Sequence, residues 1–137
     1  MISNTTDAVA VTTVKVSGQP GRYTFSVTLR SDDIGCDAYA DWWEVITSTG
    51  ELRYRRILAH SHVDEQPFTR SGGPVPIDPT EVVIVRGHFA DKQTDRPGYG
   101  AIALKGNVNE GFQTVEFSVT LAPEIATQPP LPTSCAF

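Results

Sequence analysis

The sequence predicts an all-β fold: an antiparallel two-sheet sandwich, immunoglobulin-like or fibronectin III-like, with about seven strands. Short runs rich in valine, isoleucine, threonine and aromatic residues recur about every 8 to 12 residues, with glycine, proline and aspartate between them. In several runs apolar and polar residues alternate, as they do in a strand with one buried face. No segment of helical length carries an uninterrupted apolar stripe, so little or no helix is expected.

The first two strands are expected over residues 8–16 and 22–30. In the first, the valines change parity near Thr12 and Thr13, which indicates a β-bulge at that point. The second alternates strictly, so one of its faces should lie in the core. That face consists of Tyr23, Phe25, Val27 and Leu29.

A β-hairpin follows. Residues 40–47 and 51–60 have strand composition, and the loop Ser48-Thr49-Gly50 between them has the length and glycine content of a hairpin connection. After the hairpin, residues 63–81 contain four prolines and a Gly-Gly pair. These residues interrupt regular structure, so one long irregular loop is predicted over 63–81.

Three more strands complete the prediction, over residues 81–89, 99–105 and 114–121, with a turn over 91–97 between the first two. The first should face the core with Val83, Val85 and Phe89, which turns His88 outward. The last alternates as clearly as residues 22–30, so both strands should face a shared core. Its apolar residues are Val115, Phe117, Val119 and Leu121.

The 137 residues should form a single domain over 1–126, followed by an extended proline-rich tail over 127–137. Cys36 and Cys135 either form one disulfide that fastens this tail or are two unrelated thiols. A disulfide would indicate an oxidising compartment. The first four residues lack signal-peptide character, which leaves a cytosolic protein or one whose leader has been removed. On balance an extracytoplasmic location, secreted or periplasmic, is favoured.

Charge and hydropathy narrow the classes of partner. The net charge of -5 argues against nucleic acid, because affinity for phosphates comes largely from lysine and arginine. The apolar runs are far shorter than the roughly 20 residues of a spanning helix, so no membrane insertion is expected. Another protein or a glycan remains as the partner. The sequence leaves the oligomeric state open.

The histidines suggest a metal site. His60 and His62 lie two residues apart, so on a strand their rings would point to one face, and His88 could supply a third ligand from a later strand. Three imidazoles suffice for zinc and suit copper equally well. The pair resembles the His-x-His copper ligands of copper-zinc superoxide dismutase, but too few further histidines exist for that family's paired site. Scattered histidines with structural roles are the alternative.

A ligand site is the other candidate. Trp42 and Trp43 are neighbours, so one ring should point inward and the other toward solvent, where it could stack on a sugar, or toward a covering loop. Phe68 and the rest of the 63–81 loop could provide that cover. Glu65 could act as a general base beside a metal. The candidate ligand-binding residues are Trp42, Trp43, Tyr54, Glu65, Phe68 and Arg70.

Other charged residues have simpler explanations. Arg53, Arg55 and Arg56 should pair with Glu44 or Glu51 across the hairpin. The acidic segment 32–37 could gather calcium, although aspartate and glycine also form ordinary turns. The sequence contains no nucleophile elbow and no phosphate-binding loop.

We therefore expect a non-enzymatic accessory or interaction module that uses the loop over 63–81 and the neighbouring strand ends. The second hypothesis is a copper- or zinc-binding protein that uses His60, His62 and His88. The third is a carbohydrate-binding module. An enzyme is less favoured, because the sequence offers no complete catalytic group.

Overall fold

The computed structural model describes residues 5–93 and 97–137. The first four residues and part of the turn predicted over 91–97 lie outside this range. The described part contains eight strands and one short 3-10 helix. They are β1 (Thr6–Gln19), β2 (Arg22–Ser31), β3 (Ala38–Thr47), β4 (Leu52–Ile57), β5 (Phe68–Val75), β6 (Val83–Asp91), β7 (Gly98–Asn107), β8 (Gly111–Glu116) and η1 (Pro123–Thr127).

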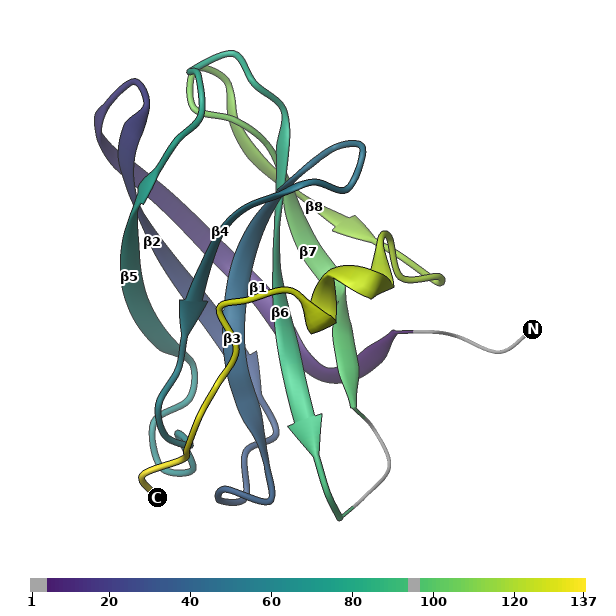
Figure 1. Cartoon of the computed structure of the whole chain (residues 1–137). Coiled ribbons are helices and arrows are strands. Elements are labelled where there is room, and N and C mark those ends of the chain that lie inside the picture. Colours follow the sequence, from purple (N-terminus) through teal and green to yellow (C-terminus); the bar gives the residue numbers. More distant parts are fainter. Residues whose placement is uncertain (1–4, 94–96) are drawn as a thin grey trace.

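All eight strands belong to one sheet, with the order β4-β3-β6-β7-β1-β2-β5 and with β8 also paired to β7. The sheet is rolled into a nearly closed barrel (Figure 1). Side chains bridge its two terminal strands: Arg56 on β4 donates from Nε to the carbonyl of Ser71 on β5 at 2.9 Å. The all-β prediction is confirmed, whereas the two-sheet immunoglobulin-like sandwich is not.

The sheet is mixed, so the antiparallel prediction is wrong. β1 and β7 run parallel, with Thr6 opposite Gly100 and Ala10 opposite Ile102. The two backbones approach closely: a Cβ atom on Gly100 would lie 2.3 Å from the carbonyl oxygen of Val9. Only glycine fits there without a shift of the backbone. Alternation shows which face of a strand is buried but not the direction of its neighbour, which is why the sequence did not reveal this pairing.

The prediction of one irregular loop over 63–81 is also wrong, because β5 lies inside it. β5 pairs with β2 along the sheet edge. Its one proline, Pro74, and its two glycines are tolerated there because an edge strand needs ladder hydrogen bonds on one side only. The remaining irregular segment between β4 and β5 is shorter, residues 58–67.

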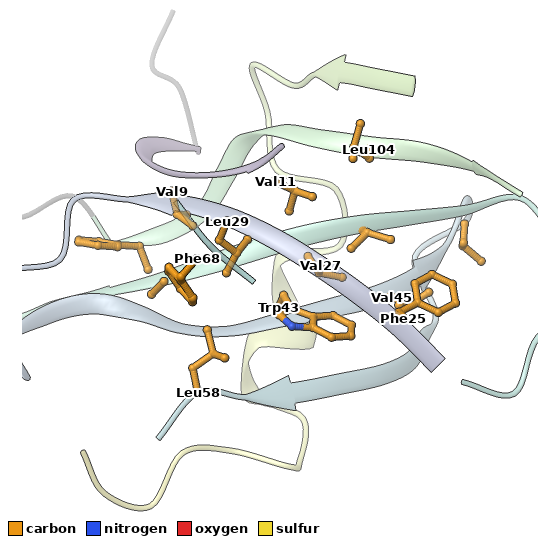
Figure 2. Close-up of a cluster of buried hydrophobic side chains, with 14 of the residues drawn as sticks. Val9, Val11, Phe25, Val27, Leu29, Trp43, Val45, Leu58, Phe68 and Leu104 are labelled. Carbon is orange, nitrogen blue, oxygen red and sulfur yellow. The ribbon is translucent and has the colours of Figure 1, made fainter. Parts of the chain in front are cut away.

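The barrel interior is the hydrophobic core (Figure 2). The predicted inward faces of residues 22–30 and 81–89 are confirmed, because their apolar residues are buried in this core. The predicted bulge in β1 is confirmed by a register shift between Val11 and Thr13. The predicted hairpin is confirmed as β3 and β4. The core includes Val9, Val11, Phe25, Val27, Leu29, Trp43, Val45, Phe68 and Phe89.

A second buried layer lies on the outer face of the sheet. Every residue of β3 is buried, which requires cover on both faces. Residues 117–132, here called the strap, cross β6, β3 and β4 on the outside, shown in yellow-green to yellow in Figure 1. Ile125 of the strap packs with Ile46 and Ile84.

The strap corrects the prediction for residues 114–121. β8 ends at Glu116, and Phe117 and Leu121 pack against the outer cluster rather than the barrel core. Val119 is 50% exposed. The chain leaves the sheet here to cover its outer face, so alternation alone overestimated the strand.

Candidate functional site

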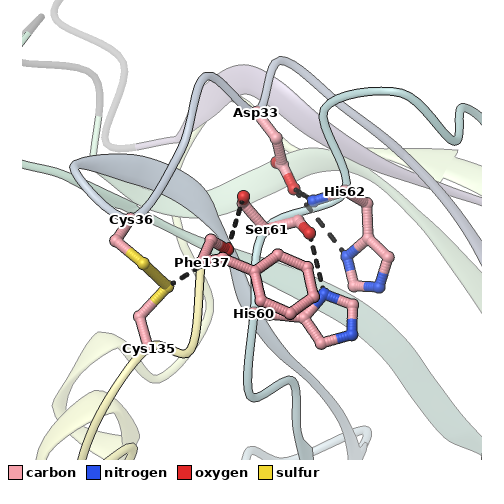
Figure 3. Close-up of a disulfide and its surroundings, with 7 residues drawn as sticks. All are labelled: Asp33, Cys36, His60, Ser61, His62, Cys135 and Phe137. Carbon is pink, nitrogen blue, oxygen red and sulfur yellow. Dashed lines mark hydrogen bonds and ion pairs between the residues drawn. A yellow bond between two sulfur atoms is a disulfide. The ribbon is translucent and has the colours of Figure 1, made fainter.

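Three segments meet at one end of the barrel, here called the histidine end. They are the β2–β3 loop (residues 32–37), the β4–β5 loop (residues 58–67) and the terminal segment 133–137. A disulfide between Cys36 and Cys135 joins the first to the third across 99 residues of sequence. Of the two arrangements open from sequence, the structure shows the bridge (Figure 3).

Hydrogen bonds fix the middle segment between the other two. The backbone N–H and the hydroxyl of Ser61 both donate to the carbonyl of Phe137 at 2.8 Å. The backbone N–H of His62 donates to Asp33 Oδ2 at 2.7 Å, and the other oxygen of Asp33 accepts from Ala40 N–H at 2.9 Å. Asp33 is buried, so its carboxylate acts as a structural anchor for the two loops.

Four rings form a column at this end. Phe137 stacks on His60 with centroids 4.5 Å apart, His60 lies 4.5 Å from His62, and His62 stacks on Phe68 at 3.7 Å. Phe68 belongs to the barrel core, whereas Phe137 is 69% exposed. The column therefore runs from the core to the surface. The two histidines stand in the middle of it.

The ring nitrogens of the two histidines differ in their partners. His60 Nδ1 lies 2.8 Å from the carbonyl of Ser61, which can only accept, so in the neutral ring Nδ1 carries the proton and Nε2 has the lone pair. The side chain of His62 is 2% exposed, and within the described part of the chain neither of its ring nitrogens has a hydrogen-bond partner. Its Nδ1 faces Asp33 Oδ2 at 3.9 Å, beyond hydrogen-bonding distance.

The surroundings keep His62 uncharged. Burial lowers the pKa of this imidazole below its ordinary value, and the positive charge of Arg70 and the neighbouring His60 lower it further. Asp33 and Glu65 oppose this shift more weakly. The ring is therefore neutral at neutral pH, with one donor and one acceptor that are both unused.

An open hollow of about 380 Å³ adjoins the pair. Its lining includes both histidines, Asp64, Glu65 and the ring of Phe137. Large apolar side chains are exposed around this end of the barrel: Ile34 at 55%, Val63 at 50% and Phe137 at 69%. A rigid barrel thus presents a mixed polar and apolar surface here.

His88 does not join the other two histidines. It lies on β6, where Nδ1 is 2.7 Å from Asp41 Oδ1 and the ring stacks on Trp42 with centroids 3.8 Å apart. Its outward orientation agrees with the prediction. Within residues 5–93 and 97–137, no group of three or more His, Cys, Asp and Glu side chains is arranged to hold a metal ion. The expected three-histidine cluster is therefore not assembled, because β4 ends at Ile57 and His60 and His62 lie in the following loop.

The strap covers a buried charge network on the outer face. Glu44 has no exposed surface and accepts from Arg55 Nε at 2.9 Å, Arg86 Nε at 2.9 Å and Trp42 Nε1 at 2.7 Å. The predicted pairing of Arg55 with Glu44 is confirmed. Arg86 and Tyr99 were not expected as partners, although the polar residues Arg86 and His88 alternating with core residues on β6 hinted at a charged outer face.

Trp42 and Trp43 point to opposite faces of β3, as expected, but neither is exposed. Trp43 is fully buried in the barrel core, and Trp42 is 3% exposed. The guanidinium of Arg55 lies 4.2 Å from the Trp42 ring centre. The premise of an exposed tryptophan is wrong, and the predicted cover by Phe68 is wrong too, since Phe68 packs in the core.

Of the other candidate ligand residues, Glu65 and Arg70 lie at the histidine end and Tyr54 does not. Tyr54 packs against Trp43 with ring centroids 5.7 Å apart. Glu65 and Arg70 form a partly exposed ion pair at 3.0 Å beside the hollow. Sequence reasoning missed Asp33 and Phe137 at this site. In the sequence, Phe137 is marked only by its position two residues after Cys135, and this spacing does not indicate a binding site.

No protein-family model matches the chain, and no solved structure matches it significantly. Over 87 residues, 64% of the chain, it is 46% identical to a protein of Halomicrobium mukohataei named "Putative lipoprotein". The match spans 40% of that protein's length. No helix in the described part of the chain is long and apolar enough to cross a membrane.

Proposed function

We propose that this chain is a non-enzymatic binding module that works outside the cytoplasm. The observation that carries the proposal is the disulfide, which uses both cysteines of the chain. Disulfides persist in oxidising compartments and are rare in the cytosol. The name of the Halomicrobium relative is consistent with an extracytoplasmic place.

The histidine end is the proposed binding surface. Loops held at the end of a rigid scaffold are common binding sites, and exposed apolar groups on such loops favour a protein partner. Ile34, Val63 and Phe137 supply these groups. A glycan is less favoured, because both tryptophans are buried and no flat indole platform is exposed.

The roles of the buried charged residues support a binding function rather than catalysis. The carboxylate of Glu44 is hydrogen-bonded to Arg55 and Arg86, and Arg55 also donates to a backbone carbonyl of the strap. The carboxylate of Asp33 holds two loops together. These contacts occupy the charged groups with structural bonds. A catalytic carboxylate or arginine would instead face a substrate space.

The compartment can be tested by alkylating thiols while the source cells are lysed. We expect no adduct on Cys36 or Cys135 by mass spectrometry until the protein is reduced, and two adducts afterwards. Protease added to intact cells should remove the protein. Two adducts without reduction, together with protection from protease, would overturn the proposed location.

The binding surface can be tested with a photo-crosslinking amino acid placed at Val63. Val119 is the matched control, because it is a valine of the same 50% exposure outside the histidine end. We expect a discrete adduct from position 63 in the source cells and none from position 119. The same adducts from both positions would show that the histidine end is not the specific surface.

A further inference from the structure

In the His60–His62 pair, the ring nitrogens of His62 are buried without hydrogen bonds to any described residue, which a purely structural role does not explain. Burying a polar group without a hydrogen bond is unfavourable, and His62 buries two ring nitrogens that lack a partner among the described residues. Most buried polar atoms in native proteins have partners, so exceptions of this kind point to a missing one. Both imidazoles line the open hollow, and the Ser61 carbonyl lies against the His60 ring.

The orientation of the rings indicates what the missing partner is. In each ring Nδ1 faces an oxygen: the Ser61 carbonyl at 2.8 Å for His60 and the Asp33 carboxylate at 3.9 Å for His62. Figure 3 shows the two Nε2 atoms on one side of the pair, away from these oxygens. Histidines that bind metals usually direct their second nitrogen to a carbonyl or carboxylate in this way.

The local chemistry favours a cation that accepts neutral imidazole. Among the described residues no group forms a hydrogen bond with either ring nitrogen of His62, so a lone pair remains for a metal ion. Asp64 and Glu65 line the same hollow; Glu65 is paired with Arg70, and the Asp64 carboxylate is a further candidate oxygen ligand beside the rings. No thiolate is available, because both cysteines form the disulfide. Imidazole ligands without thiolate suit copper(II) best among the divalent metals, followed by nickel and zinc.

We propose that His60 and His62 bind one divalent copper ion through their Nε2 atoms, with water completing the coordination. The site deepens the proposed binding role of the histidine end and rests on it. It differs from the three-histidine cluster expected from the sequence, because His88 is engaged with Asp41 and Trp42 and takes no part.

Binding requires a local movement that the structure permits. Metal–nitrogen distances are near 2 Å, so two rings tilted by 39° with centroids 4.5 Å apart must reorient to share an ion. His62 is fixed by the stacking against Phe68. His60 is only partly buried, and its outer neighbour Phe137 is largely exposed, so His60 can turn without disturbing the barrel core.

The test is a titration of the full chain, without a histidine tag and after treatment with chelator, with copper(II) alone. We expect about one equivalent by calorimetry and nitrogen hyperfine structure in the electron paramagnetic resonance spectrum. His60→Ala should weaken binding at least about tenfold, the loss seen even for an outer-shell partner. His88→Ala, the matched control for the remaining histidine, should bind as the parent does.

Three outcomes would overturn the site: no saturable binding, unchanged affinity in His60→Ala, or equal losses in His60→Ala and His88→Ala. His62→Gln serves as a second variant, with its fold checked by circular dichroism, because His62 packs against the core. The titration is independent of the thiol and crosslinking experiments. If copper does not bind, but the thiol experiment shows an extracytoplasmic protein and position 63 gives a specific adduct, the metal site is wrong and the proposed function still stands.

Discussion

Arg55 and Glu44 form an ion pair in which neither side chain has any exposed surface, with Nη2 2.7 Å from Oε1. Arg86 binds the other oxygen of the same carboxylate at 2.9 Å. Two guanidiniums against one carboxylate leave an excess positive charge, and backbone carbonyls of the strap solvate it. Arg55 donates to the carbonyls of Ile125, Gln128 and Pro130, and Arg86 donates to those of Leu121 and Ala122.

This network makes the strap part of the folded domain. The segment 127–137 was predicted to be an extended tail outside the domain, yet its carbonyls accept from Arg55, and its last residues are tied to Cys36 and Ser61. Charge-assisted hydrogen bonds are about twice as strong as neutral ones. The proline-rich sequence therefore packs on the sheet surface.

Replacing Glu44 with glutamine should lower the free energy of unfolding by about 3–5 kcal/mol, because two buried guanidiniums lose their counter-charge. Urea unfolding followed by tryptophan fluorescence measures this change. Arg53→Gln is the control, since Arg53 forms only partly exposed pairs with Glu51 and Glu81 and should cost no more than about 1 kcal/mol. Equal costs for the two variants would contradict the importance assigned to the network.

Removing the disulfide by Cys36→Ser with Cys135→Ser should cost about 2–5 kcal/mol, as for native disulfides in small secreted domains. The bridge closes a loop of 99 residues, so the unfolded chain gains much freedom without it. Thermal unfolding with and without reductant measures the effect. The reductant should destabilise the parent protein only, and an equal response in the double variant would show that it acts elsewhere.

The burial of Trp42 and Trp43 predicts that iodide quenches the tryptophan fluorescence of the folded protein only weakly. At 3% and 0% exposure, the indoles should be poorly accessible to iodide in the folded protein and become accessible on unfolding. A Stern–Volmer plot in the native state and in denaturant gives the comparison. Native quenching as strong as that of the unfolded chain would reveal an exposed ring and revive sugar stacking through Trp42.

Stability should fall in alkaline solution because of Tyr99. Burial, reinforced by the Glu44 carboxylate, raises the pKa of this phenol well above its ordinary value near 10. A raised folded-state pKa gives stability that is fully present below the unfolded value and is lost as pH rises above it. The free energy of unfolding should therefore stay level from about pH 7 to 9 and decline above about pH 10.

Tyr99→Phe separates this effect from general alkaline instability. The variant should be less stable at pH 8 by about 1–3 kcal/mol, because it loses a hydrogen bond to the buried carboxylate. It should also decline less steeply above pH 10, with the buried Tyr39 contributing to what remains, since burial raises the pKa of that phenol too. Identical pH profiles for parent and variant would exclude Tyr99 as the source.

The sequence by itself determined the elements whose pattern is local. The alternation in β2, the bulge near Thr12 and the β3–β4 hairpin were predicted because each depends on residues close together in the chain. The core face of β6 and the outward position of His88 followed from the same period of two. For the candidate site, sequence reasoning identified His60 and His62 as a pair.

Only the tertiary structure decided the rest. Whether strands close into one mixed sheet depends on long-range pairings such as β1 with β7, which alternation does not specify. The cover over Trp42 comes from the side chains of Arg55 and His88 on neighbouring strands. Phe137 reaches His60 because the disulfide and Ser61 hold the terminal segment there. Such contacts join residues far apart in the chain, so no local pattern records them.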